Sequence, residues 1–186
     1  MSATSETTIP GYVAGTWAID PVHSEVGFSV RHMMVSKVRG KFSGFSGDIV
    51  TGDSPLDSSV TATIDLSSID TGNPDRDNHI RSADFFDVDT HKTMTFRSTA
   101  VRVDDRGYVL DGELTLKGIT RPVSLRLELG GFGQDPYGRL RTGFTATGEL
   151  NRSDFGVDFN AVLETGGVVV ADKVAIHLEI EAVLEA

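Results

Sequence analysis

The sequence predicts a single all-β domain of mostly antiparallel strands, with one or two short helices. Apolar and polar residues alternate along most of the chain from Trp17 onward, which is the period of a strand with one face in water. Residues that favour turns recur between the alternating runs. The length of 186 residues fits one domain that can fold without disulfide bridges.

The alternating runs divide the chain into candidate strands. They cover residues 25–34, 60–66, 94–98, 108–116, 123–129, 140–150 and 174–180. In the first run one face carries Val26, Phe28, Val30, His32 and Met34. Residues 104–107 and 133–138 have the composition of hairpin turns. About eight or nine such strands fit a closed barrel whose interior holds one small ligand.

Three glycines interrupt the third strand of the chain, which we expect directly after the run at residues 25–34. Gly40, Gly44 and Gly47 interrupt it at short intervals. A bulge or a sharp bend at such positions would allow the sheet to close on itself.

Residues 73–81 break the alternation. Asn73 is a good helix cap, Pro74 suits the first helical position, and acidic residues follow in the first turn. We expect a short helix here that runs into the adjacent pair Phe85 and Phe86. A second irregular stretch, residues 151–172, separates the last two candidate strands and could lie across one end of the barrel.

Composition restricts the classes of function. The chain has no cysteine, which excludes disulfides, thiolate zinc sites and cysteine nucleophiles. Acidic residues outnumber basic ones by 27 to 17, so the net charge is −10. Because such a surface repels phosphate backbones and anionic lipid heads, we expect no nucleic-acid binding and no peripheral membrane binding.

The N-terminal segment lacks the features of a secretory signal. Residues 1–15 contain neither a basic region nor an apolar core, and we expect a disordered tail there, followed by one domain over residues 16–186. No apolar run approaches the ~18 residues of a membrane span. We therefore expect a cytoplasmic location.

Motifs for catalysis are weak. His23 and Ser24 are adjacent, so in an extended chain they point to opposite faces and cannot pair as base and nucleophile. The five histidines include no pair at helical metal-ligand spacing. A metal site built from His32, His79 and His91 stays open as an alternative, and it would support a metal-assisted hydrolase.

Large apolar residues gather around the expected helix. They are Ile80, Phe85, Phe86, Met94 and Phe96. These residues either form core or line a cavity, with Met33 and Met34 as adaptable walls, and periodicity alone does not decide between the two. In the second case residues 73–86 form one rim of the cavity.

Several segments resemble the YceI-like family, in the order in which the family has them. They are WAIDPVHS (17–24), FSVRHM (28–33), RGKF (39–42), IDTG (69–72), RDNHIRS (76–82), DFFD (84–87), GELTLKGITRPV (112–123) and NRSDFG (151–156). The match spans about residues 17–180, which is essentially the whole expected domain.

The resemblance implies an eight-stranded antiparallel lipocalin-like barrel with an internal hydrophobic tunnel. The family is known for binding polyisoprenoids, including isoprenoid quinones, some members bind fatty-acid-like chains, dimers are common, and no enzymatic activity is agreed. We therefore expect a homodimeric, non-enzymatic protein without a cofactor that binds, stores or transports such a lipid. The expected ligand-binding residues are Phe28, Val30, His32, Met34, His79, Ile80, Phe85, Phe86, Met94, Phe96, Leu114, Phe144 and Phe155.

Overall fold

The computed structural model of the chain describes residues 9–160 and 169–186. The strands are β1 (Gly15–Ile19), β2 (Glu25–His32), β3 (Ser36–Phe42), β4 (Phe45–Thr51), β5 (Ser59–Asp65), β6 (Ile69–Asp70), β7 (Thr93–Asp104), β8 (Gly107–Leu116), β9 (Ile119–Gln134), β10 (Leu140–Asn151) and β11 (Val170–Leu184). The helical elements of this part are η1 (Pro55–Asp57), η2 (Leu66–Ser68), α1 (Pro74–Arg81) and η3 (Arg152–Phe155). None of these helices is long and apolar enough to span a bilayer.

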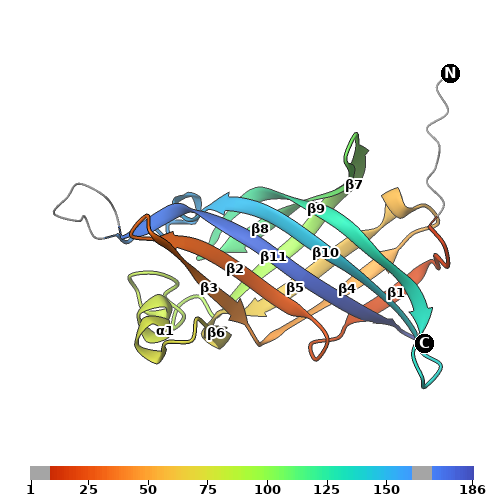
Figure 1. Cartoon of the computed structure of the whole chain (residues 1–186), viewed down its shortest axis with the longest axis horizontal. Coiled ribbons are helices and arrows are strands. Elements are labelled where there is room, and N and C mark those ends of the chain that lie inside the picture. The colour runs from red at the N-terminus through yellow and green to blue at the C-terminus, as the bar shows by residue number, and fades with distance from the viewer. Residues whose placement is uncertain (1–8, 161–168) are drawn as a thin grey trace.

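The strands form a closed antiparallel barrel of eight long strands, as predicted, with a lipocalin-like fold (Figure 1). Three of the eight are interrupted, because β1 continues as β2, β3 as β4, and β5 as β6. The other five are β7 to β11. β11 closes the ring by pairing with β1 through residues 182–184 and with β2 through residues 170–179.

Strand periodicity decides which side chains lie inside. In β11, Ile176 and Leu178 pack in the interior, whereas the His177 side chain between them is 59% exposed. In β2, Val26 and Phe28 pack inward while Arg31 is exposed. The inward and outward phases expected from the sequence are thus confirmed for these strands.

Side chains fill the end of the barrel at which β1 and the C-terminus lie (Figure 1). Trp17 is fully buried there and packs with Ile49, Ile180 and Ala182. Its ring nitrogen donates a hydrogen bond of 2.8 Å to the hydroxyl of Thr51, so the one polar atom of the indole is satisfied. This end of the barrel is therefore ordinary close-packed core.

The packed chain begins earlier than the expected domain boundary at residue 16. The Tyr12 hydroxyl donates to the carbonyl of Gly52 at 2.7 Å, and Val13 packs beside the Trp17 cluster. β1 then starts at Gly15. Residues 1–8 of the expected tail lie outside the described residues.

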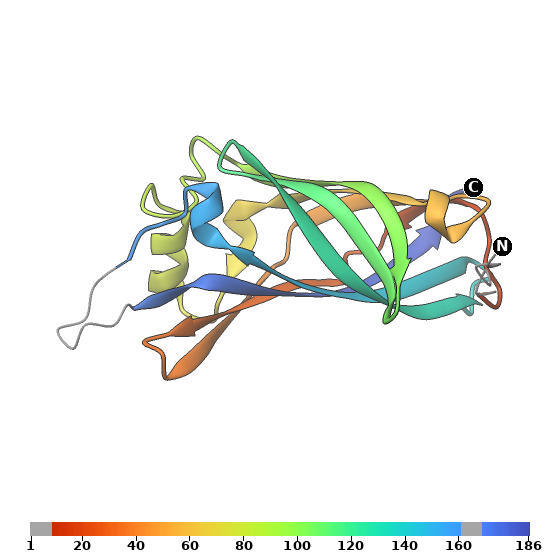
Figure 2. The same ribbon diagram turned by 90° about the horizontal axis from the view of Figure 1, so that it is seen from above.

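α1 lies at the other end of the barrel (Figures 1 and 2). The helix expected from the sequence is confirmed: Asn73 caps it by accepting a hydrogen bond from the Arg76 backbone at 3.1 Å, and Pro74 is its first residue. Asp77 is buried and accepts from the backbone nitrogen and the hydroxyl of Thr71. Arg76 donates to the hydroxyl and the carbonyl of Thr71, both at 2.7 Å. These bonds fix α1 to the end of β6.

Of the three glycines expected at a bulge or a sharp bend, Gly44 lies in the break between β3 and β4, whereas Gly40 and Gly47 lie within those strands. Gly40 lies within β3, where an added Cβ would come 2.4 Å from the ring of Phe28. It therefore permits close packing of a ring against the backbone. The register shifts that bend the sheet lie at Ser98/Ala100, Gly143/Phe144 and Val170/Val174.

An ion-pair network centred on Arg141 lies at the end of the barrel that the Trp17 cluster fills. Arg141 contacts Asp135 at 2.8 Å and Asp20 at 2.9 Å. A third carboxylate, Glu181, lies 3.0 Å from the same guanidinium. The hydrogen bond from Arg141, followed by one with His23, holds the pKa of Asp20 well below its ordinary value. Arg141 likewise lowers the pKa of Asp135 to about 2.

We expect this network to make the fold sensitive to acid. Because the folded state favours ionised Asp20 and Asp135, their contribution is fully present above pH 3.8 and is lost as the pH falls towards about 2. An Arg141→Gln variant should melt at a lower temperature at neutral pH and lose less stability in acid. Thermal melts from neutral pH to about pH 2 test this, and equal acid dependence in the two proteins would contradict it.

Candidate ligand-binding cavity

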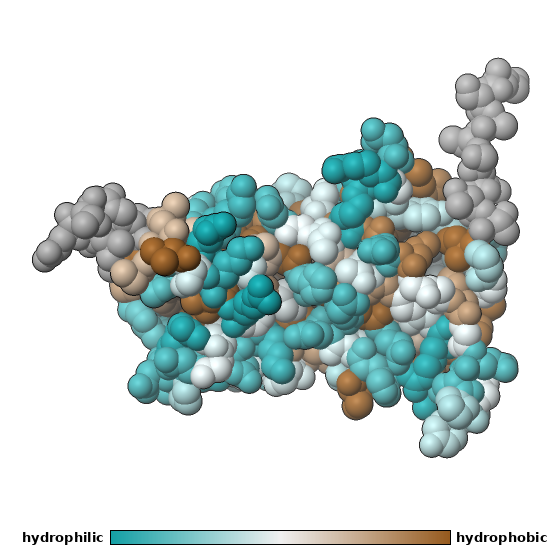
Figure 3. Space-filling view, viewed as in Figure 1, coloured by the Kyte–Doolittle hydropathy of each residue, from teal (hydrophilic) through white to brown (hydrophobic). Residues whose placement is uncertain are grey.

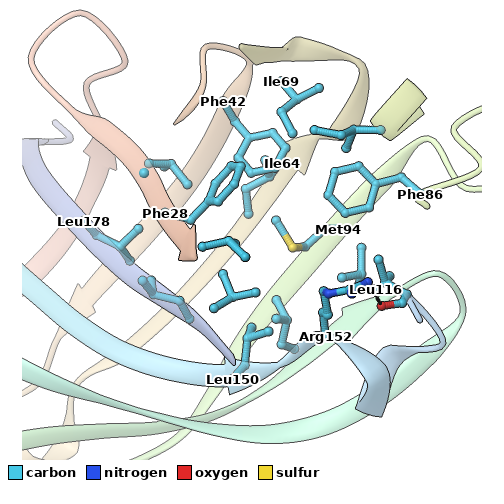
Figure 4. Close-up of a pocket in the computed structure, with 18 of the residues that line it drawn as sticks. Phe28, Phe42, Ile64, Ile69, Phe86, Met94, Leu116, Leu150, Arg152 and Leu178 are labelled. Carbon is cyan, nitrogen blue, oxygen red and sulfur yellow. Dashed lines mark hydrogen bonds between the residues drawn. The ribbon is translucent and has the colours of Figure 1, made fainter. Parts of the chain in front are cut away.

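A cavity of about 420 Å³ lies inside the barrel, within the range of roughly 300–1,000 Å³ of small-molecule sites. Figure 4 shows side chains from several strands converging on it, with Met94 near the middle and the rings of Phe28, Phe42 and Phe86 around it. Most of the lining side chains are aliphatic or aromatic. The interior is therefore an apolar chamber rather than a water-filled polar one.

The structure brings most of the expected residues to this cavity. Eleven of the thirteen residues expected to bind ligand line it: Phe28, Val30, His32, His79, Ile80, Phe85, Phe86, Met94, Phe96, Leu114 and Phe144. They come from β2, α1, the segment after α1, β7, β8 and β10. The large apolar residues around the helix thus line the cavity, the reading that periodicity alone left open.

Two of the expected residues do not line the cavity. Met34 is 62% exposed, because β2 ends at His32 and the strand alternation does not extend through the following turn. Phe155 is 1% exposed, but it belongs to the buried core cluster and lies in η3, an element that contacts β9, β10 and β11. Met34 was assigned by extending strand parity past the end of β2, where parity no longer applies. Phe155 lies in the irregular stretch 151–172, to which strand parity never applied.

The sequence interpretation missed a large part of the wall. The missed apolar side chains include Phe42, Ile64, Ile69, Leu116, Leu125, Leu150, Val157, Ile176, Leu178 and Ile180. Several of these share the inward phase of strands that the alternation had already identified, so the same signal could have found them. Val157 follows η3 and carries no such signal.

The polar lining groups gather at one end, near α1. Apart from Ser46, the polar residues of the cavity wall are Arg31, His32, Thr71, Arg76, His79, Arg152 and Asn160. The side chain of Arg31 itself follows the outward phase of β2 and is exposed. Among the described residues that line the cavity, three arginines carry positive charge and none is acidic. The cavity therefore has an apolar body and a basic polar end.

Arg152 is the most buried of these cations, at 7% exposure. Its guanidinium donates to the carbonyls of Ala171, Val157 and Phe159 at 2.8–2.9 Å, and to that of Val170 at 3.3 Å. Burial lowers the pKa of Arg152, because the surroundings stabilise the charged form less than water does. The side chain ties the segment after η3 to the start of β11.

Aromatic rings form the rim next to Arg152. The rings of His79, Phe85 and Phe159 meet edge to face, with centroids 5.1–5.3 Å apart. His79 also contacts Asp84 at 2.8 Å, and the Arg152 guanidinium lies 6.0 Å from the Phe85 ring. Figure 2 shows η3 and α1 at the same end of the barrel. This arrangement agrees with the expectation that residues 73–86 border the cavity. Part of the irregular stretch 151–172 also borders the cavity. Residues 161–168 of that stretch lie outside the described part of the chain.

The three histidines of the hydrolase alternative do not form a metal site in the described part of the chain. His32 and His79 line the cavity, but His91 does not. The one group of possible ligands within the described ranges is Asp20, His23 and Glu181, at the opposite end of the barrel. Arg141 contacts both of those carboxylates and already supplies the positive charge there.

A closed antiparallel barrel around an apolar cavity is the architecture of a binding protein for a hydrophobic ligand. The model of the YceI-like domain matches residues 17–182, and the chain belongs to that family. A UPF0312 protein of Staphylococcus epidermidis is 40% identical over 164 residues, which cover 87% of this chain and 94% of the relative. One from Photorhabdus laumondii is 39% identical over 134 residues, 72% of this chain and 70% of its own.

Solved structures share the fold. BcnA of Burkholderia cenocepacia aligns with a TM-score of 0.75 and 26% identity, over 88% of this chain and 98% of its own. The YCEI protein of Campylobacter jejuni aligns with a TM-score of 0.69 and 28% identity, over 90% and 96%. A polyisoprenoid binding domain from Saccharophagus degradans aligns at 0.69 and 16% identity, over 93% and 100%, and this likeness concerns the fold alone.

Proposed function

We propose that this protein binds a polyisoprenoid or another long-chain amphiphile, such as an isoprenoid quinone, and so stores or transports it. The observation that carries the proposal is the division of the cavity into an apolar body and a polar end near α1. An amphiphile has the same division. Membership of the YceI-like family and the polyisoprenoid binding domain among the structures of the same fold support it.

The apolar body supplies the binding free energy. Each isoprene unit brings five carbons, and its full burial contributes about 3–4 kcal/mol before opposing terms. Ordering a flexible chain removes part of this gain, so affinity rises with chain length more slowly than burial alone would give. A few units are enough for tight binding.

The polar end selects the head group. Arg76 and Arg152 make that end positive, and the ring nitrogens of His32 and His79 can form hydrogen bonds with a head group. Carbonyl, phosphate or carboxylate heads fit these partners, whereas a cationic head would be repelled. We therefore expect neutral hydrogen-bond acceptors or anions as heads.

Mass spectrometry of organic extracts from the purified protein tests the proposal. We expect a long-chain lipid in the extract, and uptake of an isoprenoid quinone by protein from which lipid has been removed. Two blanks are extracted in the same way. One is the buffer alone, and the other is an unrelated protein that has no internal cavity and is purified by the same procedure. An extract without long-chain lipid, together with no uptake, would refute the proposal.

We expect no catalysis from this site. The YceI-like domain is a binding domain, and we expect the protein to release its ligand without changing it chemically. Elemental analysis of the isolated protein addresses the hydrolase alternative. Stoichiometric zinc or iron that disappears together with a hydrolytic activity in a His79→Ala variant would overturn this expectation.

Two further expectations concern the protein as a whole. We expect a homodimer, and light scattering on delipidated protein measures the oligomeric state. A monomer at all concentrations would contradict this expectation.

We also expect a cytoplasmic location, and fractionation of the cells that produce the protein measures it. Recovery of the protein in the envelope fraction would contradict this expectation.

A further inference from the structure

The turn between β2 and β3 exposes three consecutive apolar side chains, Met33, Met34 and Val35, which we call the hairpin tip. They are 44%, 62% and 84% exposed. The Val35 nitrogen donates to the His32 carbonyl at 3.1 Å, and both methionines between them have positive φ, 52° and 61°. Such turns ordinarily carry Asn and Gly. Turn formation therefore does not explain the two methionines, and neither does burial.

The strands beside the tip carry a cluster of cations. No acidic residue occurs between Glu25 and Asp48. Four exposed cations follow the outward phase of the hairpin, and we call them the basic face: Arg31, Lys37, Arg39 and Lys41. Within residues 9–160 and 169–186 none of them has an ion-pair partner. Arg31 and Lys37 lie directly opposite each other, an unfavourable pairing for strand stability.

The hairpin stands at the polar end of the cavity. His32 and Val38 of the hairpin line the cavity, and the Met33 nitrogen donates a hydrogen bond to the carbonyl of Val169 at 2.7 Å. Figure 2 shows the hairpin extending away from the barrel at the end that holds α1. In Figure 3, brown and tan apolar surface lies at this end of the molecule beside teal polar surface.

We propose that the β2–β3 hairpin docks this end of the barrel onto an anionic lipid surface. The hairpin tip enters the head-group layer, and the basic face contacts the lipid phosphates. This places the polar end of the cavity at the membrane surface, where an amphiphile can pass between bilayer and barrel. The passage of ligand depends on the proposed function, whereas the docking itself does not.

The net charge of −10 does not oppose this docking. Screening limits the reach of exposed charges to about 8 Å at physiological ionic strength, so the membrane is attracted by the local basic face rather than repelled by the distant acids. A second copy of the chain is a poorer partner for the same surface. Two basic faces brought together would repel each other, whereas an anionic bilayer complements both the charge and the apolar tip.

Flotation with vesicles tests the proposal. We expect the full-length protein to bind vesicles of phosphatidylglycerol and phosphatidylcholine, more weakly at high salt, and not vesicles of phosphatidylcholine alone. Changing Lys37, Arg39 and Lys41 together to Gln should reduce the partition coefficient about fivefold for each cation, hence about a hundredfold. The double change Met33→Asn and Met34→Gly should reduce it by about tenfold or more.

The variants are chosen so that a failure to fold does not obscure the result. Asn and Gly suit the positive φ of the turn, so the tip variant should melt no lower than the wild type. Val22 is 85% exposed in another turn, and Val22→Asn is the matched control for loss of apolar surface. A triple change of Arg97, Arg106 and Arg121 to Gln is the control for charge. Neither control should alter flotation.

Each outcome decides the proposal. Loss of flotation in the tip and basic-face variants, with unchanged uptake of isoprenoid quinone from detergent solution, supports it. Flotation that no variant changes overturns it, as does an absence of flotation in the wild type. A tip variant that converts a dimer to a monomer without any vesicle binding assigns the hairpin to self-association instead. Flotation by a protein whose cavity takes up no lipid leaves the docking intact and refutes the proposed function.

Discussion

Replacing Arg152 by Met is expected to destabilise the fold by about 3–5 kcal/mol, which lowers the melting temperature by roughly 10 °C. The guanidinium is buried and donates to four backbone carbonyls. Met fills a similar space but donates nothing, so the carbonyls of Val157, Phe159 and Ala171 lose the hydrogen bonds that Arg152 donates. Val170 keeps a bond from the Asn160 amide at 2.6 Å. Thermal and denaturant unfolding measure the loss.

Arg152→Lys is the matched control. It keeps the charge but offers three donors from a single nitrogen, which cannot reach carbonyls spread across two segments. We expect a loss of stability smaller than that of Arg152→Met. If both variants melt with the wild type, the segment after η3 does not depend on this arginine. If Arg152→Lys binds isoprenoid quinone normally and Arg152→Met does not, the positive charge at the polar end contributes to binding of the head group as well.

Strand phases were predictable from the sequence because each is a local property. Alternation placed Phe28 and Leu114 inside and His177 outside, and the structure confirms all three. The helix was predictable for the same reason, since the cap Asn73 and the following Pro74 act within one turn. The alternation fitted a closed barrel but did not require one, since a β-sandwich has the same polar outer faces. The eight-stranded barrel was what the resemblance to the YceI-like family implied.

The parts that sequence reasoning missed depend on contacts far apart in the chain. Arg152 has no local signal, because two of its acceptors, Val170 and Ala171, are 18 and 19 residues away. Phe155 looks like another inward aromatic, yet it lies in η3, an element that contacts three strands, and it is part of the packed core. Met34 was assigned by extending strand parity into a turn. The net charge also gave no sign of the basic face of the hairpin, because the sum of all charges in the chain does not show how they are distributed.

The middle of the cavity offers the most direct test of binding. Met94 lies there, between the rings of Phe28 and Phe86 in the view of Figure 4, and Ile64 is its partner in the register of β5 and β7. A long apolar ligand that enters from the α1 end has to pass this position to use the rest of the chamber. A larger side chain here therefore competes with the ligand for the same volume.

We expect Met94→Trp to reduce the affinity for an isoprenoid quinone at least tenfold, or by about 1.4 kcal/mol, without lowering the stability of the lipid-free protein. The indole occupies part of the empty cavity of about 420 Å³ and gains contacts there, which offsets the cost of a bulkier residue. Met94→Leu conserves volume and is the control, with near-normal binding expected. Equilibrium binding of radiolabelled quinone and thermal melts of delipidated protein provide the two readouts. Undiminished binding in a folded Met94→Trp protein would place the ligand outside the barrel and contradict the proposed function.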